Sequence, residues 1–201
     1  MTITITDNAT AQVQAIFANP ATARRRMQAI GKRVEVDLRK HFDRKNSEGN
    51  KRGWVRSNFW SKTVKRGTSF TGATENEATV TIASREFVHK LRGGTIRAKA
   101  GRMLAIPLRS QAKAAGSPGE WSTPGDGQLT FIRTKKGAYL FRNRGFRGRG
   151  IKGQRLEAWY KLVASVRHLA DPSALPEEGV LSAAVADQAE KEIAAEIRRI
   201  S

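Results

Sequence analysis

The 201-residue sequence contains no cysteine and has three histidines. Without cysteine the chain cannot form disulfide bonds, thiolate metal sites or a cysteine nucleophile, which fits a protein made in a reducing cytoplasm. His41, His89 and His168 are far apart and stand beside apolar residues of expected helices or strands. We therefore expect them to be structural or surface residues, and we expect no metal, no cofactor and no catalytic group.

Acidic residues are scarce, with 18 Asp and Glu against 37 Lys and Arg and a net charge of +19. Glycoside hydrolysis and two-metal nuclease chemistry both need clustered carboxylates. Residues 85–155 hold 17 basic residues and only three acids, Glu86, Glu120 and Asp126. No GxxxxGK[ST] loop occurs either. The sequence therefore predicts a protein that is not an enzyme.

Long apolar runs are also absent. No stretch reaches the roughly 18 apolar residues needed to span a bilayer, and the first residues lack the pattern of a signal peptide. We expect a soluble, unexported chain with no membrane partner. A charge of +19 must be offset by an anionic partner or by neighbouring subunits. Residues 171–201 carry 3 basic and 7 acidic residues, so the basic middle of one copy and this acidic end of another could meet head to tail.

The length predicts a single domain over residues 1–201. A helix is predicted to begin near Pro20 with Asn19 as its cap, because apolar residues then recur at three- and four-residue spacing up to Phe42. A final helix is predicted over about 177–200, with acids near its start and Arg198 and Arg199 near its end. A shorter helix capped by Asp7 or Asn8 precedes both.

Between these helices the pattern is that of strands and turns. Strands are predicted at 78–84 and 103–108, a strand–turn segment over 89–101, a hairpin over 128–142 with its turn at 135–137, and a last strand over 157–168. Long exposed loops are predicted at about 43–53, 109–127 and 142–155. Successive hairpins favour an α+β fold, in which an antiparallel β-sheet is packed by an N-terminal amphipathic helix and a C-terminal helix.

Two groups of residues are candidates for contacts with partners. The loop 142–155 is rich in glycine and contains no acid, so we expect its basic residues to face an acidic neighbouring subunit or DNA. These basic residues are Arg142, Arg144, Arg147, Arg149, Lys152 and Arg155. The aromatic residues Trp54, Phe59 and Trp60 are either interface anchors or one end of the core.

The stretch EFVHKLRGGTIRAKAGRMLAIPLR, residues 86–109, resembles a signature of phage virion-morphogenesis and tail-completion proteins, which are minor tail or neck components of Mu-like and related tailed phages. The matching residues are His89, Gly93, Gly94, Thr95, Ile96, Lys99, Leu104, Ala105, Ile106 and Pro107. RGWVRSNFW, YLFRNRG and LVASVRH are also similar to segments of that family, so the resemblance covers about residues 25–170. The chain departs from the family after its last strand, where RHLADPSALPEEG replaces an ARPFL-type segment.

The resemblance implies a non-enzymatic virion structural protein that forms a ring, expected to be a hexamer, at the head-proximal end of the tail or in the neck. There it would complete the tail or join it to the head. The implied partners are further copies of the chain, adjacent tail, terminator or neck and connector proteins, and genomic DNA in the lumen, contacted without sequence specificity. The protein would be assembled in the bacterial cytoplasm and reside in the virion. Composition alone supports an alternative, a basic nucleic-acid-binding protein of the ribosomal or nucleoid type.

Overall fold

The computed structural model describes residues 18–48, 53–54, 57–121, 129–146 and 154–200. Helices and antiparallel strands make up the described chain, with a helix at each end, and this confirms the predicted α+β class. The contacts divide the chain into two compact units. Unit 1 comprises residues 1–48, 58–91 and 171–201, and unit 2 comprises residues 49–57 and 92–170. The stretch 1–201, which the length predicts as one domain, thus consists of unit 1 with the two segments of unit 2 inserted into its sequence.

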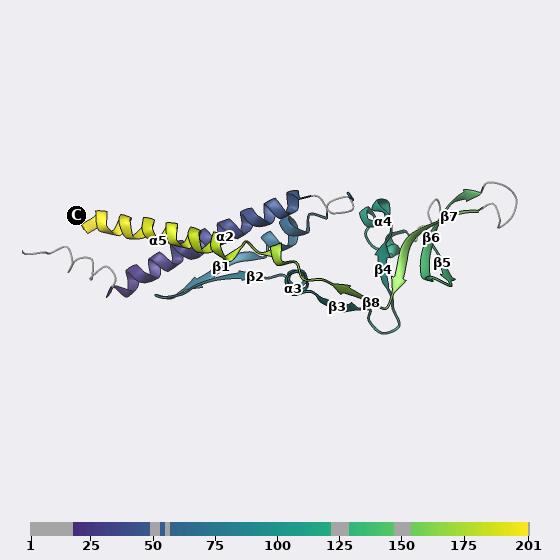
Figure 1. The fold of residues 1–201 in the computed structure, drawn as a ribbon, viewed down its shortest axis with the longest axis horizontal. Helices are drawn as coiled ribbons and strands as arrows, with labels where there is room; N and C mark the ends of the chain where they lie inside the picture. The colour runs from purple at the N-terminus through teal and green to yellow at the C-terminus, as the bar shows by residue number, and fades with distance from the viewer. Residues whose placement is uncertain (1–17, 49–52, 55–56, 122–128, 147–153, 201) are drawn as a thin grey trace, which may run out of the picture. The chain divides into compact units, whose positions relative to one another are not determined.

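Unit 1 is built on two long helices and a β-hairpin (Figure 1). Its elements are α2 (Pro20–Ser47), the π-helix η1 (Trp60–Lys65), β1 (Thr68–Ala73), β2 (Ala78–Ile82), α3 (Arg85–Arg92), the 3-10 helix η4 (Pro172–Ala174) and α5 (Glu178–Ile200). Helix α2 begins where the sequence predicts, because the Asn19 side chain accepts hydrogen bonds from the backbone N–H groups of Ala21 and Thr22 at 3.0 and 3.3 Å. Helix α5 matches its prediction to within one residue. The expected helix at Asp7 or Asn8 lies outside the described residues.

Helix α2 packs on both α5 and the antiparallel β1–β2 hairpin. The buried Gly31 lets the helix approach the hairpin closely, since a β-carbon there would lie 2.5 Å from ring carbons of Phe70. Farther along α2, Leu38 and Phe42 join Val64, Phe87 and Ala174 in the buried core of unit 1. The predicted apolar stripe of α2 therefore contributes to the core of unit 1.

Two predictions in unit 1 are wrong in detail. Residues 43–47, expected to open a loop, continue α2, where Asp43 accepts a salt bridge from Lys65 at 2.7 Å. Residues 89–92, expected as strand and turn, belong to helix α3. Helix α3 begins at Arg85, because the Ser84 hydroxyl accepts a hydrogen bond from the Phe87 N–H at 3.2 Å and caps the first turn.

Unit 2 contains mostly strands. Its elements are β3 (Gly94–Arg97), β4 (Leu104–Pro107), α4 (Ser110–Ala114), the 3-10 helix η2 (Pro118–Trp121), β5 (Leu129–Thr134), β6 (Gly137–Phe146), β7 (Gln154–Val163) and β8 (Ser165–His168). Strands β4, β7, β6 and β5 form one antiparallel sheet in that order, and β3 pairs with β8 in a separate two-stranded sheet. The predicted hairpin is confirmed, with Gly137 at its turn (φ 129°).

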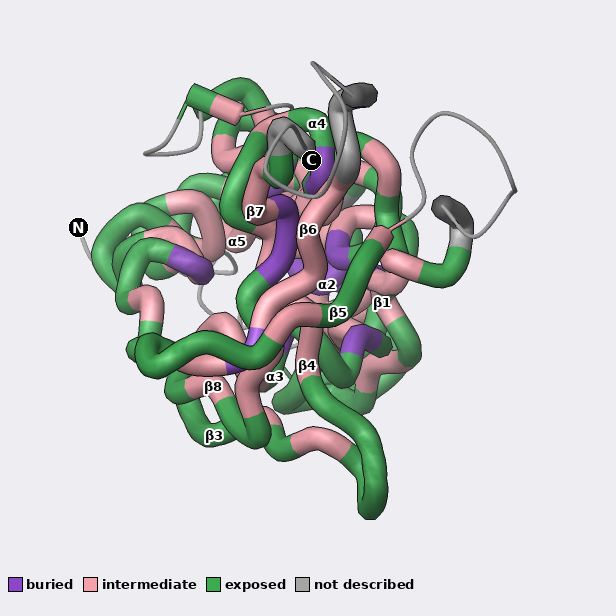
Figure 2. Tube along the Cα trace, turned by 90° about the vertical axis from the view of Figure 1, so that its right-hand side faces the viewer, coloured by how far each residue is buried: buried purple, intermediate pink, exposed green. Residues whose placement is uncertain are grey.

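The core of unit 2 is centred on two consecutive aromatic residues of β7. In the β6–β7 ladder Leu140 pairs with Tyr160 and Phe141 pairs with Ala158, so Trp159 is an extra residue in a β-bulge. A bulge interrupts the alternation of side chains, which explains why neighbouring Trp159 and Tyr160 are both buried. They pack with Ala112 of α4. Figure 2 shows a buried stretch on β7, with the largely exposed β5 on the other side of β6.

Three further expectations for unit 2 need correction. The last strand, predicted to run unbroken over 157–168, is two strands that pair with different partners, β7 with β4 and β8 with β3. They separate at Ala164, whose carbonyl accepts a hydrogen bond from the Ala98 N–H at 2.8 Å. The expected loop 109–127 contains α4 and η2, and the ends of the expected loop 142–155 extend β6 and β7 as far as the pair Phe146–Gln154.

No helix in the described ranges combines the length and the apolar character required to cross a bilayer.

Candidate interaction surface

The two units differ sharply in charge. Unit 1 holds 17 basic and 15 acidic residues, a net charge of +2, whereas unit 2 holds 20 basic and 3 acidic residues, a net charge of +17. Almost the whole excess of the chain therefore belongs to unit 2. Like charges held together in a compact body repel one another, so the electrostatic repulsion within the chain is concentrated in unit 2.

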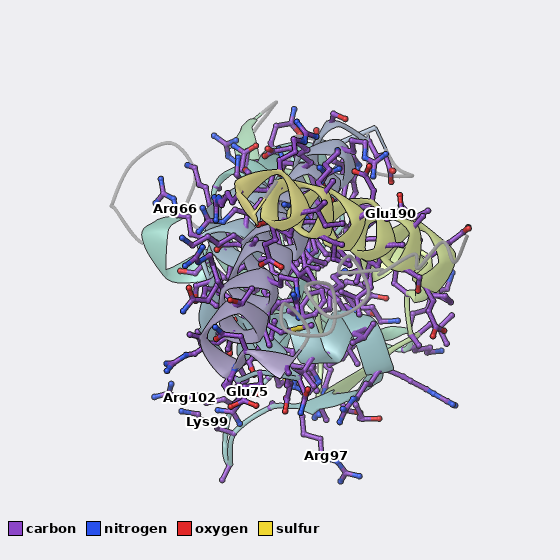
Figure 3. All side chains as sticks on the ribbon, turned by 90° about the vertical axis from the view of Figure 1, so that its left-hand side faces the viewer. Arg66, Glu75, Arg97, Lys99, Arg102 and Glu190 are labelled. Carbon is purple, nitrogen blue, oxygen red and sulfur yellow. The ribbon has the colours of Figure 1, made fainter. Side chains whose placement is uncertain are left out.

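Unit 1 compensates its charges internally. Its shortest ion pairs, with distances between 2.7 and 3.2 Å, are Arg26–Glu196, Arg33–Asp37, Arg39–Glu35, Lys45–Glu48, Lys65–Asp43 and Lys191–Asp187. Two of these carboxylates, Asp187 and Glu196, belong to the acidic C-terminal helix, and Glu196 is paired with α2. The acidic end of the chain thus serves partly to neutralise α2. Other acids of this helix, such as Glu178 and Glu190, are exposed, and Figure 3 labels Glu190.

The described part of unit 2 offers its basic residues far fewer acids. Glu157 is the one carboxylate whose side chain is described there, and it is half-buried. It accepts an ion pair from Arg109 at 2.8 Å and a hydrogen bond from the Trp159 Nε1–H at 3.2 Å. The guanidinium of Arg142 lies 4.6 Å from the centre of the Trp159 ring, a cation–π contact. Glu157 is therefore already engaged at the core of this unit.

The two-stranded sheet of β3 and β8, here called the ribbon, carries a polar face. Thr95 pairs with Arg167 and Arg97 pairs with Ser165. Directly paired residues of an antiparallel ladder point to the same side, so these four exposed side chains share one face. The other face carries Ile96, Val166 and His168, which are all half-buried. The ribbon is therefore amphipathic, and its exposed face presents two guanidinium and two hydroxyl groups.

Residues 98–103 project from this ladder as a turn that connects β3 to β4. The last residue of β3 pairs with Ser165, and the first residue of β4 pairs with Val163. The six residues of the turn therefore lie opposite one residue of the other chain segment, Ala164. The Arg102 N–H donates to the Lys99 carbonyl at 3.0 Å, and Gly101 between them has φ 72°. Arg97, Lys99 and Arg102 are exposed, and in Figure 3 their side chains point away from the ribbon.

The basic residues predicted in the loop 142–155 are described only in part. Arg142 is half-buried on β6 against Trp159. Arg144 lies in β6 and Arg155 lies in β7, and for both residues only the position of the backbone is described. Arg147, Arg149 and Lys152 lie outside the described residues.

The residues that resemble the phage signature mostly build the ladders of unit 2. Gly94, Thr95 and Ile96 form β3, and Leu104, Ala105, Ile106 and Pro107 form β4. Gly93 has φ 71°, and a β-carbon there would lie 2.8 Å from both the His168 carbonyl oxygen and the Ala170 nitrogen. His89 is half-buried on α3 in unit 1. Lys99 differs from the other nine in projecting from an exposed turn, which leaves its charge available to a partner.

The three predicted aromatic residues occupy different places. Phe59 and Trp60 pack against the core of unit 1, where the Trp60 ring stacks on Phe42 with ring centres 6.0 Å apart. Trp54 belongs to unit 2 and is half-buried. Packing of this kind supports the interpretation of Phe59 and Trp60 as core residues.

The histidines lie on separate elements, and the described ranges contain no group of three His, Cys, Asp or Glu residues placed to hold a metal ion. His41 of α2 lies with its Nε2 3.2 Å from the Ser173 carbonyl oxygen. Burial lowers the pKa of His41, as do the nearby charges of Arg44 and Lys45, and the hydrogen bond to Ser173 opposes them. His41 thus acts as a packed link between α2 and η4.

The ribbon and the β3–β4 turn are features that sequence reasoning did not single out. The signal was present, because Arg97, Lys99, Arg102 and Arg167 are basic residues at or near the expected strands. What the sequence did not show is that 94–97 pairs with 165–168, which places Arg167 diagonally across the ladder from Arg97.

Comparison of the chain with protein-family models, with curated proteins and with solved structures finds no match.

Proposed function

We propose that this chain is a non-enzymatic bacteriophage virion protein that completes the tail or joins it to the head. The observation that carries the proposal is the division of charge, in which a nearly neutral unit 1 is combined with a unit 2 of net charge +17. A component of a ring around a DNA passage needs no catalytic group, and it benefits from one basic part that faces DNA or an acidic neighbour.

The resemblance in residues 86–109 supports the same proposal. In this structure most of the matching residues have architectural roles, as backbone ladders in β3 and β4 or as the close backbone approach at Gly93. Residues used in this way specify a scaffold rather than a reaction. The role of the chain would then reside in the surfaces that this scaffold presents.

Assembly into a ring has a structural basis in the open edges of the sheet. In the described part of unit 2, β4 and β5 each pair on one side only. The unpaired N–H and C=O groups of an edge strand can pair with another chain. Phe131 on β5 is 57% exposed and adds an apolar contact at that edge. We expect copies of the chain to associate through such edges in a ring, for which a hexamer is the expected order.

The alternative function is a basic nucleic-acid-binding protein of the ribosomal or nucleoid type, and the charge of unit 2 favours it as well. The two functions differ in what the free protein does. A virion component forms a ring of defined size or joins purified tails, whereas a nucleoid-type protein coats free DNA or RNA without reference to any particle. Sedimentation of the purified protein, with and without tails, separates these outcomes.

The decisive test is genetic. Deleting the gene from its parent phage should leave separate heads and tails, or tails of defective length, in negative-stain images, and expression from a plasmid should restore virions. A variant with Arg144, Arg147 and Arg149 replaced by Ala should fold normally and yet restore fewer infectious particles. Normal joined virions from the deletion phage would rule out the proposed function.

A further inference from the structure

We infer that the ribbon and the β3–β4 turn bind the phosphate backbone of double-stranded DNA, through Arg97, Lys99, Arg102 and Arg167. The inference rests on the proposed function for its setting, because it names the partner that the basic unit 2 would meet in the lumen of a ring. It names a second surface for contact with DNA, distinct from the basic loop 142–155.

The first argument is geometric. Arg97 and Arg167 are diagonal neighbours across the ladder, so their β-carbons lie about 7–8 Å apart on one flat face. Lys99 and Arg102 extend the same set of charges along the turn that follows β3. A row of cations on a narrow two-stranded element suits a polyanion whose charges are regularly spaced, and DNA carries one negative charge per roughly 1.7 Å of helix axis. A β-ribbon is also narrow enough to enter the major groove of DNA.

The second argument is electrostatic. All four side chains are exposed, and none of them forms an ion pair with a carboxylate anywhere in the described ranges. In unit 1, Arg26, Arg33 and Arg39 each pair with an acid within 2.9 Å. Other exposed basic residues of unit 1, such as Arg25 and Arg66, form no ion pair among the described residues and therefore serve as controls below. The basic side chains of the ribbon therefore keep their full attraction for an external anion.

The third argument separates DNA from an acidic protein. The exposed face of the ribbon presents guanidinium and hydroxyl groups, Thr95 and Ser165 supplying the latter. On the turn that completes this surface, Met103 is the one large apolar side chain that is exposed, at 45%. Protein–protein interfaces are centred on aromatic and aliphatic anchors. Interfaces with DNA are more polar and more positively charged, and hydroxyl and guanidinium groups are the usual donors to phosphate oxygens. The composition of this face therefore favours nucleic acid.

The test measures binding of the full-length protein to a fluorescent 30-base-pair duplex of random sequence over a range of salt concentrations. The ribbon variant carries R97Q, K99Q, R102Q and R167Q. The control variant carries R25Q, K62Q, R66Q and R85Q. It also removes three arginines and one lysine, but from exposed positions of unit 1 that form no ion pair among the described residues. Circular dichroism establishes that both variants are folded.

We expect the ribbon variant to bind at least about tenfold more weakly, and the magnitude of the slope of log affinity against log salt to fall by about 3.6, because each of the four phosphate contacts contributes about 0.9 to it. The control variant should retain most of the affinity and the slope. Equal losses in both variants, or no binding by the wild-type protein, would overturn the inference. Competition by polyglutamate as effective as that by DNA at equal charge would point instead to an acidic protein.

The ribbon variant should also be tested for rescue of the deletion phage. DNA binding by the wild-type protein together with normal virions from the deletion phage would leave the ribbon inference standing and remove the proposed function. Loss of virions in the deletion phage, with DNA binding unchanged in the ribbon variant, would support the proposed function and overturn the ribbon inference.

Discussion

Arg26 of α2 and Glu196 of α5 form a buried ion pair, with Nη1 2.7 Å from Oε2 and with 10% and 6% of the two side chains exposed. The second carboxylate oxygen of Glu196 has no hydrogen-bond partner among the described residues. Burying two charges costs several kcal/mol per ion, which their attraction only partly offsets. We interpret the pair as fixing the alignment of α2 with α5. Helix α5 is rich in alanine, and its small side chains alone would define that alignment only weakly.

Breaking this pair on one side should be costly. We expect R26A to lower the free energy of unfolding by about 3 kcal/mol, because it leaves the Glu196 carboxylate buried without its cation. The double variant R26M/E196L should cost much less than the sum of the two single changes, since no charge then remains buried. Urea denaturation followed by circular dichroism measures both. Additive losses in the double variant would show that the pair does not act as a unit.

Gly93 and Gly101 provide a matched pair in unit 2, with φ of 71° and 72°. An alanine at either position takes on a left-handed conformation that costs roughly 1–2 kcal/mol. At Gly101 nothing lies within 4 Å of the added β-carbon, whereas at Gly93 it would lie 2.8 Å from backbone atoms of His168 and Ala170. We therefore expect G93A to destabilise the protein clearly more than G101A in thermal unfolding. Equal melting temperatures for the two variants would contradict the close approach at Gly93.

The parts of the fold that could be predicted from sequence are those encoded locally. The apolar stripe ending at Phe42, the Asn19 cap and the hairpin at Gly137 all depend on residues a few positions apart, and each is found where it was predicted. Helix α3 was missed because its pattern is short and the Gly93–Gly94 pair beside it suggested a turn. The consecutive burial of Trp159 and Tyr160 was missed because it depends on the β6–β7 register, which has no signature within β7 alone.

The candidate site illustrates the same limit. The excess of basic residues over 85–155 is plain in the sequence, but two consequences depend on the fold. The first is that Glu196 neutralises Arg26 about 170 positions away. The second is that Arg167 lies across the ribbon from Thr95. Which charges are compensated, and which stay exposed together, is decided by long-range pairing that composition does not contain.

The two tyrosines of the chain allow a direct test of the core of unit 2. The buried Tyr160 hydroxyl donates to the Ala112 carbonyl at 2.7 Å, whereas the Tyr139 hydroxyl donates to the Lys136 carbonyl at 3.2 Å in an exposed turn. We expect Y160F to cost about 1–3 kcal/mol, because it leaves a buried carbonyl unpaired. Y139F should cost much less, since water can replace the lost hydroxyl. Urea unfolding of the two variants gives the comparison, and similar losses would refute the anchoring of α4 through Tyr160.

His41 should make the stability of the protein depend on pH. Burial and the charges of Arg44 and Lys45 lower its pKa from the ordinary value of 6.5, so the unfolded chain binds the proton more tightly than the folded one. The stabilising contribution of neutral His41 is therefore present above the unfolded pKa and is lost as the pH falls through and below it. We expect the free energy of unfolding to decrease between about pH 7.5 and about pH 5.5, and to decrease less in H41Q, which cannot take up the proton. Parallel pH profiles of the wild-type protein and H41Q in urea denaturation would assign the dependence to other groups.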